Sequence, residues 1–174
     1  MPSNSVLLRI GRTLAILAFA FAAASSALAT KKEIVGPVAF EVPDSFAAIS
    51  GKPPGLHEEK SGITIEVTEL PLEALKEFKG AAFLDFLASL GYTNAAYGEH
   101  ALKRTDAHTF VTADAKGKQG PESRFLLVLG GAGRAAIVTA YAPKRQIASG
   151  AASTAGIEEI LSSAIVVAPD GSAR

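Results

Sequence analysis

Apolar and polar positions alternate in several short segments of the chain, which predicts a protein built mostly of strands. In the segment ITIEVTEL, residues 63–70, Ile63, Ile65 and Val67 fall on one side, with threonine and glutamate on the other. A period of two residues is that of a strand with one buried face. Similar segments predict strands at 38–42, 109–115, 123–129 and 135–142, a short strand at 46–49, a loop at 50–55 and a polar turn at 116–122.

Between residues 72 and 90 the apolar spacing changes to three and four residues, which predicts a helix with one apolar stripe. Gly80 predicts a break between a loose first turn and a firmer helix over 81–90, and Gly91 fits the left-handed position that ends many helices. The expected stripe consists of Leu75, Phe78, Ala82, Phe83, Phe86, Leu87 and Leu90.

A second amphipathic segment, near the C-terminus, predicts another short helix. Its apolar positions are Ile157, Ile160, Leu161 and Ala164. Segment 164–167 follows, either as a last strand or as a tail laid along the sheet. Strands outnumber helices and are joined by short turns, so the predicted class is α+β, with an antiparallel sheet flanked by helices.

The segment LGGAGRAAIVTA matches the glycine-rich pattern of a dinucleotide-binding loop, but its surroundings indicate a hairpin. In a dinucleotide fold this loop opens a helix whose free N–H groups bind the pyrophosphate. Here strand-forming residues follow Gly133 and continue to Pro143. We therefore expect no nucleotide cofactor, a turn with positive φ at Gly130, Gly131 and Gly133, and a solvated Arg134.

Residues 1–29 have the features of a secretory signal peptide. Arg9 and Arg12 precede an apolar run at 14–24, and Ala27-Leu28-Ala29 matches an A-x-A cleavage site. The run is shorter than the roughly 20 apolar residues of a membrane-spanning helix. We therefore expect export by the general secretory route, cleavage after the last alanine of this site and a periplasmic location without a membrane anchor.

The expected mature chain, residues 30–174, is long enough for a single α+β domain with one core. The sequence has no cysteine, which excludes disulfides, thiol catalysis and thiolate metal sites. Without Arg9 and Arg12, 15 of its 17 basic residues remain against 17 acidic ones, a net charge of −2. This near balance predicts no long-range attraction to nucleic acid or to an anionic membrane.

The three histidines of the sequence form no recognised metal-binding motif. His57 begins the segment HEEKS, so no second histidine completes an H-E-x-x-H pattern. His100 and His108 flank an expected turn. Together with Glu99 or Asp106 they leave a zinc site open as an alternative.

Other candidate catalytic groups also lack the partners that catalysis requires. Ser162 and Ser163 do not lie in a G-x-S-x-G elbow. The paired carboxylates are neighbours in sequence and therefore point to different faces: Glu58 with Glu59, and Glu158 with Glu159. We therefore expect no catalytic residue, no cofactor and no enzymatic activity. The aromatic candidates for a binding surface are Tyr92, Tyr97 and Tyr141.

The order of these elements resembles the Mog1/PsbP-like superfamily over residues 34–168. The matching residues are Phe40, Pro43 and Phe46 in an aromatic-x-x-Pro-x-x-aromatic opening, and Leu161, Ser163 and Ile165 in a closing leucine–x–serine turn. The resemblance implies an antiparallel sheet sandwiched by helices and a mostly non-catalytic binding or assembly role. Members include small-GTPase partners, photosystem subunits and exported bacterial proteins. The group has no shared catalytic motif, so no functional residue is carried over.

The sequence thus predicts an exported, non-enzymatic protein with a binding or accessory role in the cell envelope and a protein partner there. One alternative is a carrier of a small apolar ligand, held in a cavity between the sheet and Phe83, Phe86 and Leu87. Another is a hydrolase or metal enzyme built on the histidines.

Overall fold

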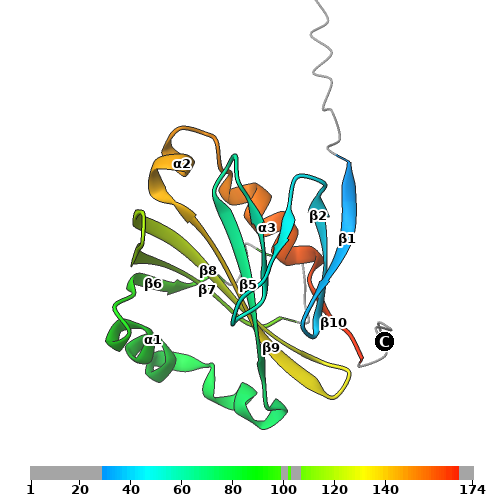
Figure 1. Ribbon diagram of the computed structural model, residues 1–174. Helices are drawn as coiled ribbons and strands as arrows, with labels where there is room; N and C mark the ends of the chain where they lie inside the picture. The colour runs from blue at the N-terminus through cyan, green and yellow to red at the C-terminus, as the bar shows by residue number, and fades with distance from the viewer. Residues whose placement is uncertain (1–28, 99–101, 103–106, 169–174) are drawn as a thin grey trace, which may run out of the picture.

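Two antiparallel sheets and four helices make up the computed structural model, which describes residues 29–98, 102 and 107–168 (Figure 1). The larger sheet has the order β3-β4-β5-β9-β8-β7-β6 and the smaller one β1-β2-β10. The strands are β1 (Thr30–Val35), β2 (Val38–Pro43), β3 (Ala47–Ile49), β4 (Gly55–Glu58), β5 (Ile63–Leu70), β6 (Thr93–Tyr97), β7 (Ala107–Gly117), β8 (Gly120–Gly131), β9 (Arg134–Pro143) and β10 (Ile165–Val166). The helices are the 3₁₀ helix η1 (Leu72–Glu77), α1 (Gly80–Ser89), α2 (Lys144–Ala148) and α3 (Thr154–Ser163).

The central strands of the larger sheet confirm the predicted α+β class. β5 has the predicted bounds of 63–70, and β8 and β9 form the predicted antiparallel hairpin. Their pairing runs from Glu122 opposite Pro143 to Gly131 opposite Arg134. The glycine-rich loop therefore joins two strands, and the helix that a dinucleotide site needs is not present after it.

The turn of this hairpin differs from the prediction in its details. Positive φ angles occur at Ala132 (50°) and Gly133 (74°), as a two-residue type I′ turn requires. Gly130 serves another purpose, because a Cβ there would lie 2.6 Å from the Leu75 side chain of η1. Arg134 is partly exposed, in keeping with the predicted solvated arginine, and its Nε donates to Glu69 Oε1 at 2.8 Å in an exposed ion pair.

Several elements were missed or misplaced because tertiary pairing decides them. β1 carries two lysines, and only Val35 of its six residues is buried, so its apolar signal is weak. β4 begins inside the expected 50–55 loop, where β5 supplies its partner. The expected polar turn at 116–122 is mostly strand, since β7 and β8 pair as far as Gly117 opposite Gly120.

The main core lies on one face of the larger sheet, here called the inner face, which packs against α3. Alternation in the strands places Ile65, Leu127 and Val138 on this face, and all are fully buried. α3 contributes the residues predicted for it: Ile157, Ile160 and Leu161. β2 of the smaller sheet closes the same core with Val38, Phe40 and Val42.

The C-terminal segment joins the two sheets through α3 and β10. Ser153 caps α3 by accepting from the Gly156 N–H at 3.3 Å. At the other end, Ser163 Oγ accepts from the backbone N–H of Glu41 on β2 at 2.9 Å. Residues 165 and 166 then pair with β2, so of the two predicted alternatives the segment forms a strand.

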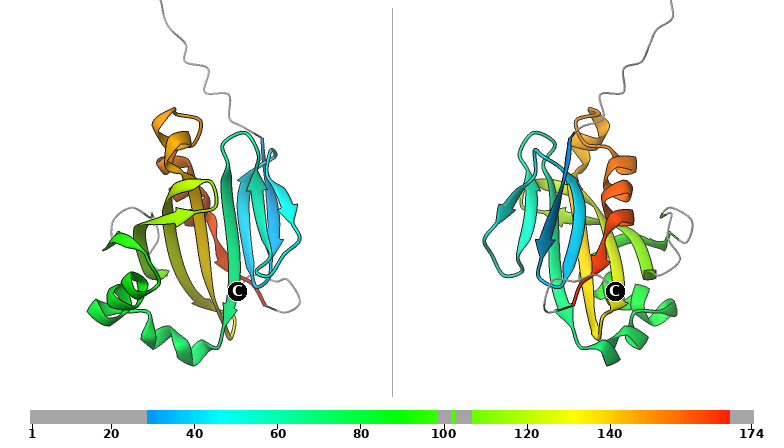
Figure 2. Two further views of the ribbon diagram at one scale, coloured as in Figure 1. Left: turned by 60° about the vertical axis from the view of Figure 1, so that its left-hand side comes forward. Right: turned by 90° about the vertical axis from the view of Figure 1, so that its right-hand side faces the viewer.

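η1 and α1 lie on the opposite, outer face of the larger sheet from α3 (Figure 2). Gly80 and Gly91 have φ angles of 68° and 86°, which confirms the predicted break and the left-handed cap. Phe83 and Leu87 are buried against β7 and β8. The rest of the predicted stripe divides, because Phe86 and Leu90 are exposed.

Candidate binding surface

The outer face of the larger sheet is polar beyond the part that α1 covers. α1 packs on Val111 of β7 and Leu126 of β8. Next to them, the strand register places Arg124 of β8 beside Tyr141 of β9. Glu66 of β5 lies on the same face, so three adjacent strands contribute to one polar and aromatic area.

Arg124 is the centre of this area, between two tyrosine rings. Its Cζ lies 4.9 Å from the ring centroid of Tyr141 and 5.5 Å from that of Tyr92, within the range of cation–π contacts. Nη1 donates to Tyr92 Oη at 3.1 Å and Nη2 donates to Glu122 Oε2 at 3.0 Å. The guanidinium therefore ties the segment after α1 to β8 and β9.

Glu122 is the buried partner of this arginine. Its side chain is 8% exposed, against 23% for Arg124. The carboxylate fills the space beside Gly117, where a Cβ would lie 1.6 Å from Glu122 Oε1. A carboxylate buried this far is costly unless it is paired, so Arg124 is required for Glu122 to be there.

The tyrosine on β9 extends the network toward β5 and β4. Tyr141 Oη donates to Glu66 Oε1 at 3.0 Å. Burial, with a further contribution from Glu66, raises the pKa of Tyr141, so the phenol stays protonated at neutral pH and remains a donor. On the next strand, His57 Nδ1 lies 2.9 Å from Thr64 Oγ1. The area thus offers hydroxyl, imidazole and carboxylate groups around a rigid arginine.

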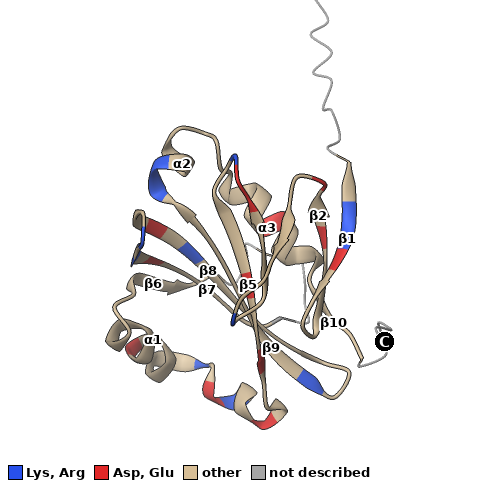
Figure 3. Ribbon diagram, in the orientation of Figure 1, with Lys and Arg blue, Asp and Glu red and all other residues tan. Residues whose placement is uncertain are grey.

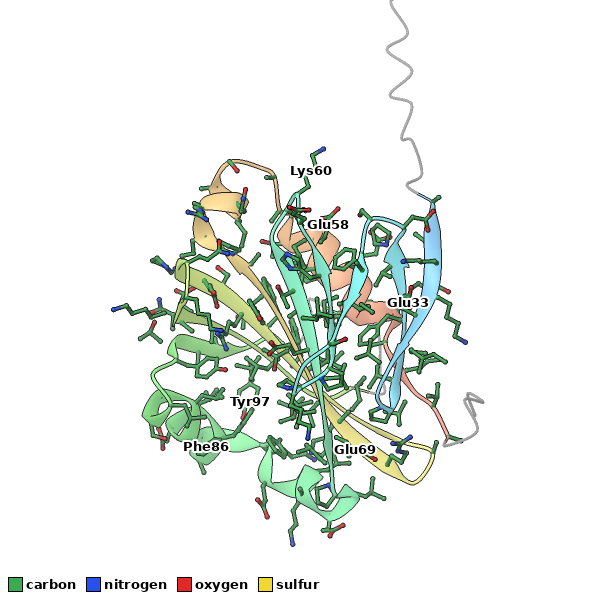
Figure 4. All side chains as sticks on the ribbon, in the orientation of Figure 1. Glu33, Glu58, Lys60, Glu69, Phe86 and Tyr97 are labelled. Atoms are coloured by element: carbon green, nitrogen blue, oxygen red, sulfur yellow. The ribbon has the colours of Figure 1, made fainter. Side chains whose placement is uncertain are left out.

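α1 adds an exposed apolar face to this polar area. Phe86 is 53% exposed and Leu90 is 58% exposed. Figure 4 shows Phe86 on α1, pointing away from the sheet. Asp85 is the single charged residue between Gly80 and Ser89. A helix that is apolar on more than its buried side has a face without a partner in the fold.

These two areas are continuous through a short connection. Leu90 caps α1, Gly91 reverses the chain, and the Tyr92 N–H donates to Leu87 O at 3.1 Å. Tyr92 then lies over Arg124. We define the outer surface as this set of exposed or half-buried residues: Phe86, Leu90, Tyr92, Tyr141 and Glu66.

The histidines are not brought together in the described part of the chain. His57 is on β4 with Thr64 as its partner. His108 is on β7, and its buried Nε2 has no hydrogen-bond partner among the residues that the structure describes. His100, Glu99 and Asp106 lie outside the described residues. Within 29–98, 102 and 107–168, no group of three histidines or carboxylates is placed to hold a metal ion.

The predicted serines and one of the predicted carboxylates, Glu58, have structural contacts. Glu58 accepts hydrogen bonds from Ser45 Oγ, at 2.6 Å, and from Ser61 Oγ, while Glu59 is exposed. These bonds join the β2–β3 segment to the β4–β5 turn. Ser162 and Ser163 donate to carbonyl groups of their own helix, at Glu158 and Ile160. The Ser162 and Ser163 hydroxyls are engaged by backbone carbonyls, which are not bases that could activate them.

The three residues expected to line a ligand cavity do not lie together in the interior. Phe83 and Leu87 pack closely with Val111 and Leu126, as core side chains do. Phe86 points to solvent instead. The lining that the carrier alternative requires is therefore not formed by this helix.

Charges of both signs are interspersed over the sheets and helices (Figure 3). Lys144 Nζ lies 2.7 Å from Asp114 Oδ2, and Asn94 Nδ2 donates to the same oxygen at 2.7 Å. The Lys144 bond, followed by that of Asn94, lowers the pKa of Asp114. Such local pairing fits the sequence prediction of a surface without a strong long-range field.

The exposure of Phe86 and the role of Arg124 were missed in the sequence. The segment SRFLLVL predicts a strand, but nothing in its pattern indicates a role for the arginine. The signal for an exposed apolar face was the composition of 80–90, which has one charge among eleven residues. A helix with so few polar positions has more apolar surface than one contact can bury.

Within the described ranges, the helices are too short or too polar to cross a membrane. No protein-family model matches the sequence, and no curated protein sequence matches it.

Solved structures, in contrast, show the fold. The solution structure of cyanobacterial PsbP (CyanoP) from Synechocystis sp. PCC 6803 superposes with a TM-score of 0.53 at 10% identity, covering 80% of this chain and 93% of that one. The crystal structure of the Ran-binding protein Mog1p of Saccharomyces cerevisiae gives 0.49 at 13% identity, with coverages of 82% and 98%. The superposition on PsbP shows that the protein has the fold of that structure, which agrees with the Mog1/PsbP-like architecture that the order of its elements predicted.

Proposed function

We propose that this chain is an exported, non-enzymatic binding or accessory protein of the bacterial cell envelope, and that it contacts a protein partner through the outer surface. The observation that carries the proposal is the exposed apolar face of α1. Large apolar side chains that remain exposed beside an aromatic and polar area are typical of protein-binding sites.

The residue types of the outer surface support a protein partner. Tyr92 and Tyr141 are half-buried and held in place by Arg124, so they present aromatic edges at little further cost in side-chain entropy. Phe86 and Leu90, on the helix that immediately precedes Tyr92 in the chain, supply exposed apolar area. Interfaces combine an apolar centre of this kind with aromatic and arginine side chains and a polar rim.

The chemistry of the same area supports binding over catalysis. Tyr141 has a raised pKa and its hydroxyl is already engaged by Glu66, so it is a poor nucleophile and a poor base. Both terminal nitrogens of Arg124 are engaged by Tyr92 and Glu122. The hydrogen bonds among these groups hold their side chains in fixed positions on the surface.

Export to the periplasm is part of this proposal and rests on the sequence of residues 1–29. The basic flank, the short apolar run and the A-x-A site support it.

Photo-cross-linking in the native host tests this proposed surface. A photoreactive phenylalanine analogue would replace Phe86 or Leu90, one position at a time. Because these side chains point outward, we expect both variants to fold and to form an adduct of the same mass with one envelope protein. The adducts would be detected by blotting and identified by mass spectrometry.

The matched controls are two exposed positions elsewhere on the molecule. Ile34 on β1 is 52% exposed, so it is as apolar and as accessible as Phe86. Lys60 lies in the β4–β5 turn at the far end of the sheet from α1 (Figure 4). Neither position is expected to give this adduct. Equal adduct formation at all four positions, or an adduct at Ile34 alone, would overturn the proposed surface.

A further inference from the structure

β1 starts at the residue that directly follows the expected end of the signal peptide. Thr30 is its first residue and is paired with Pro43 of β2. One residue earlier, the carbonyl oxygen of Ala29 accepts a hydrogen bond of 3.0 Å from the backbone N–H of Asp44. The Ala29–Thr30 peptide bond therefore lies at the hydrogen-bonded end of the β1–β2 hairpin.

This placement conflicts with cleavage of the folded chain. A peptidase needs its substrate as an extended segment whose backbone groups are free, and proteolysis concentrates in backbone that is exposed and unpaired. In the folded chain the Ala29 carbonyl is occupied by Asp44, and Thr30 is aligned on β2. We propose that pairing of β1 with β2 shields the Ala29–Thr30 bond, so that the signal peptide is removed before this end of the hairpin closes. The inference rests on the export proposed above.

Hydrolysis at this bond changes the end of the hairpin. The bond between the Ala29 carbonyl carbon and the Thr30 nitrogen breaks, and water supplies the hydroxyl that makes Ala29 a carboxylate. Thr30 keeps its nitrogen as an ammonium group. The mature chain then lacks the hydrogen bond between Ala29 and Asp44 and begins at the first paired residue of β1.

The packing of β1 suits a strand that closes late. Val35 is its one buried residue, and it lies at the far end from Thr30. β2 is mostly buried and is supported without β1, because β10 pairs with its first residues and Ser163 of α3 binds the Glu41 N–H. The core can therefore form while the Thr30 end of β1 is still open.

The test compares cleavage of the folded and the unfolded precursor. Full-length chain, residues 1–174, is purified in a mild detergent and treated with purified bacterial signal peptidase, either folded or diluted directly from urea. We expect the folded precursor to be cut at about one tenth of the rate of the unfolded precursor, or more slowly still. Cleavage of the folded chain then depends on the small population in which the Thr30 end of β1 has opened. Intact mass identifies the bond that is cut, and circular dichroism confirms the folded state.

A precursor with a short insertion is the matched control. Ser-Gly-Ser-Gly placed between Ala29 and Thr30 leaves Ala27, Ala29 and all of β1 unchanged, but moves the scissile bond out of the ladder. Its folded and unfolded forms are expected to be cut at the same rate.

Three results would count against the inference, and they differ in what they overturn. Equal rates for the folded and unfolded natural precursor would overturn the shielding and leave export intact. A slow cut in the folded insertion variant would show that something other than the β1–β2 pairing blocks the site, which also overturns the inference. An unfolded precursor that is not cut between Ala29 and Thr30 would overturn the signal peptide itself.

Discussion

Replacing Leu127 by alanine is expected to lower the free energy of unfolding of the mature chain by about 2–5 kcal/mol. Leu127 is fully buried on the inner face of β8, in register between Phe110 of β7 and Val138 of β9. The three backbones around it are fixed by ladder hydrogen bonds, so the site cannot collapse to fill the space. Urea unfolding followed by circular dichroism measures the loss.

Phe86→Ala is the matched control for this substitution. Because Phe86 points away from the sheet, its removal is expected to change the free energy of unfolding by less than about 0.5 kcal/mol. A cost for Phe86→Ala as large as that for Leu127→Ala would mean that the outer side of α1 packs within the fold, contrary to the structure.

Replacing Arg124 by alanine is expected to cost about 2–3 kcal/mol, somewhat less than the 3–5 kcal/mol for breaking a fully buried pair, because the arginine is 23% exposed. The cost comes mainly from Glu122, whose buried carboxylate is left without its counter-charge. Tyr92 and Tyr141 also lose the guanidinium that lies between them. The difference in unfolding free energy between the unsubstituted protein and the Arg124→Ala variant measures this cost.

The double substitution Arg124→Ala with Glu122→Gln separates charge from packing. A neutral amide in place of the carboxylate removes the uncompensated charge, so the double variant is expected to be more stable than Arg124→Ala alone. The coupling energy between the two positions is obtained from the unfolding free energies of Arg124→Ala, Glu122→Gln and the double variant, each compared with the natural chain. If the loss of stability in the double variant equals the sum of the losses in the two single variants, Glu122 is not stabilised by Arg124 and the account of this pair is wrong.

Local pattern was enough to predict the elements with a clear period. Ile63, Ile65 and Val67 predicted β5, and Gly80 and Gly91 predicted the ends of α1, because each signal lies within the element itself. β1 and β4 were missed because their stability comes from a neighbouring strand. The burial pattern of β1, with one buried residue in six, leaves no periodic signal to find.

The outer surface could be predicted only in part. Tyr92 and Tyr141 were named as candidates for a binding surface, but what joins them is Arg124. That contact depends on the β8–β9 register and on the path of the chain after α1, which bring residues 92, 124 and 141 together. Phe86 was wrongly predicted to be a core residue for a similar reason. The spacing of apolar residues shows which side of α1 faces the sheet, but not how wide a part of the helix the sheet covers.

The central claim is that the outer side of α1 serves contact with a partner and is not needed for folding. The most direct test is Phe86→Asp in the native host, with the photoreactive residue at Leu90 as the reporter. We predict that the melting temperature of the mature protein stays within about 4 °C of the unsubstituted chain, the shift of a change below about 1 kcal/mol, while the partner adduct is lost. An adduct of undiminished yield in a folded Phe86→Asp protein would contradict the account.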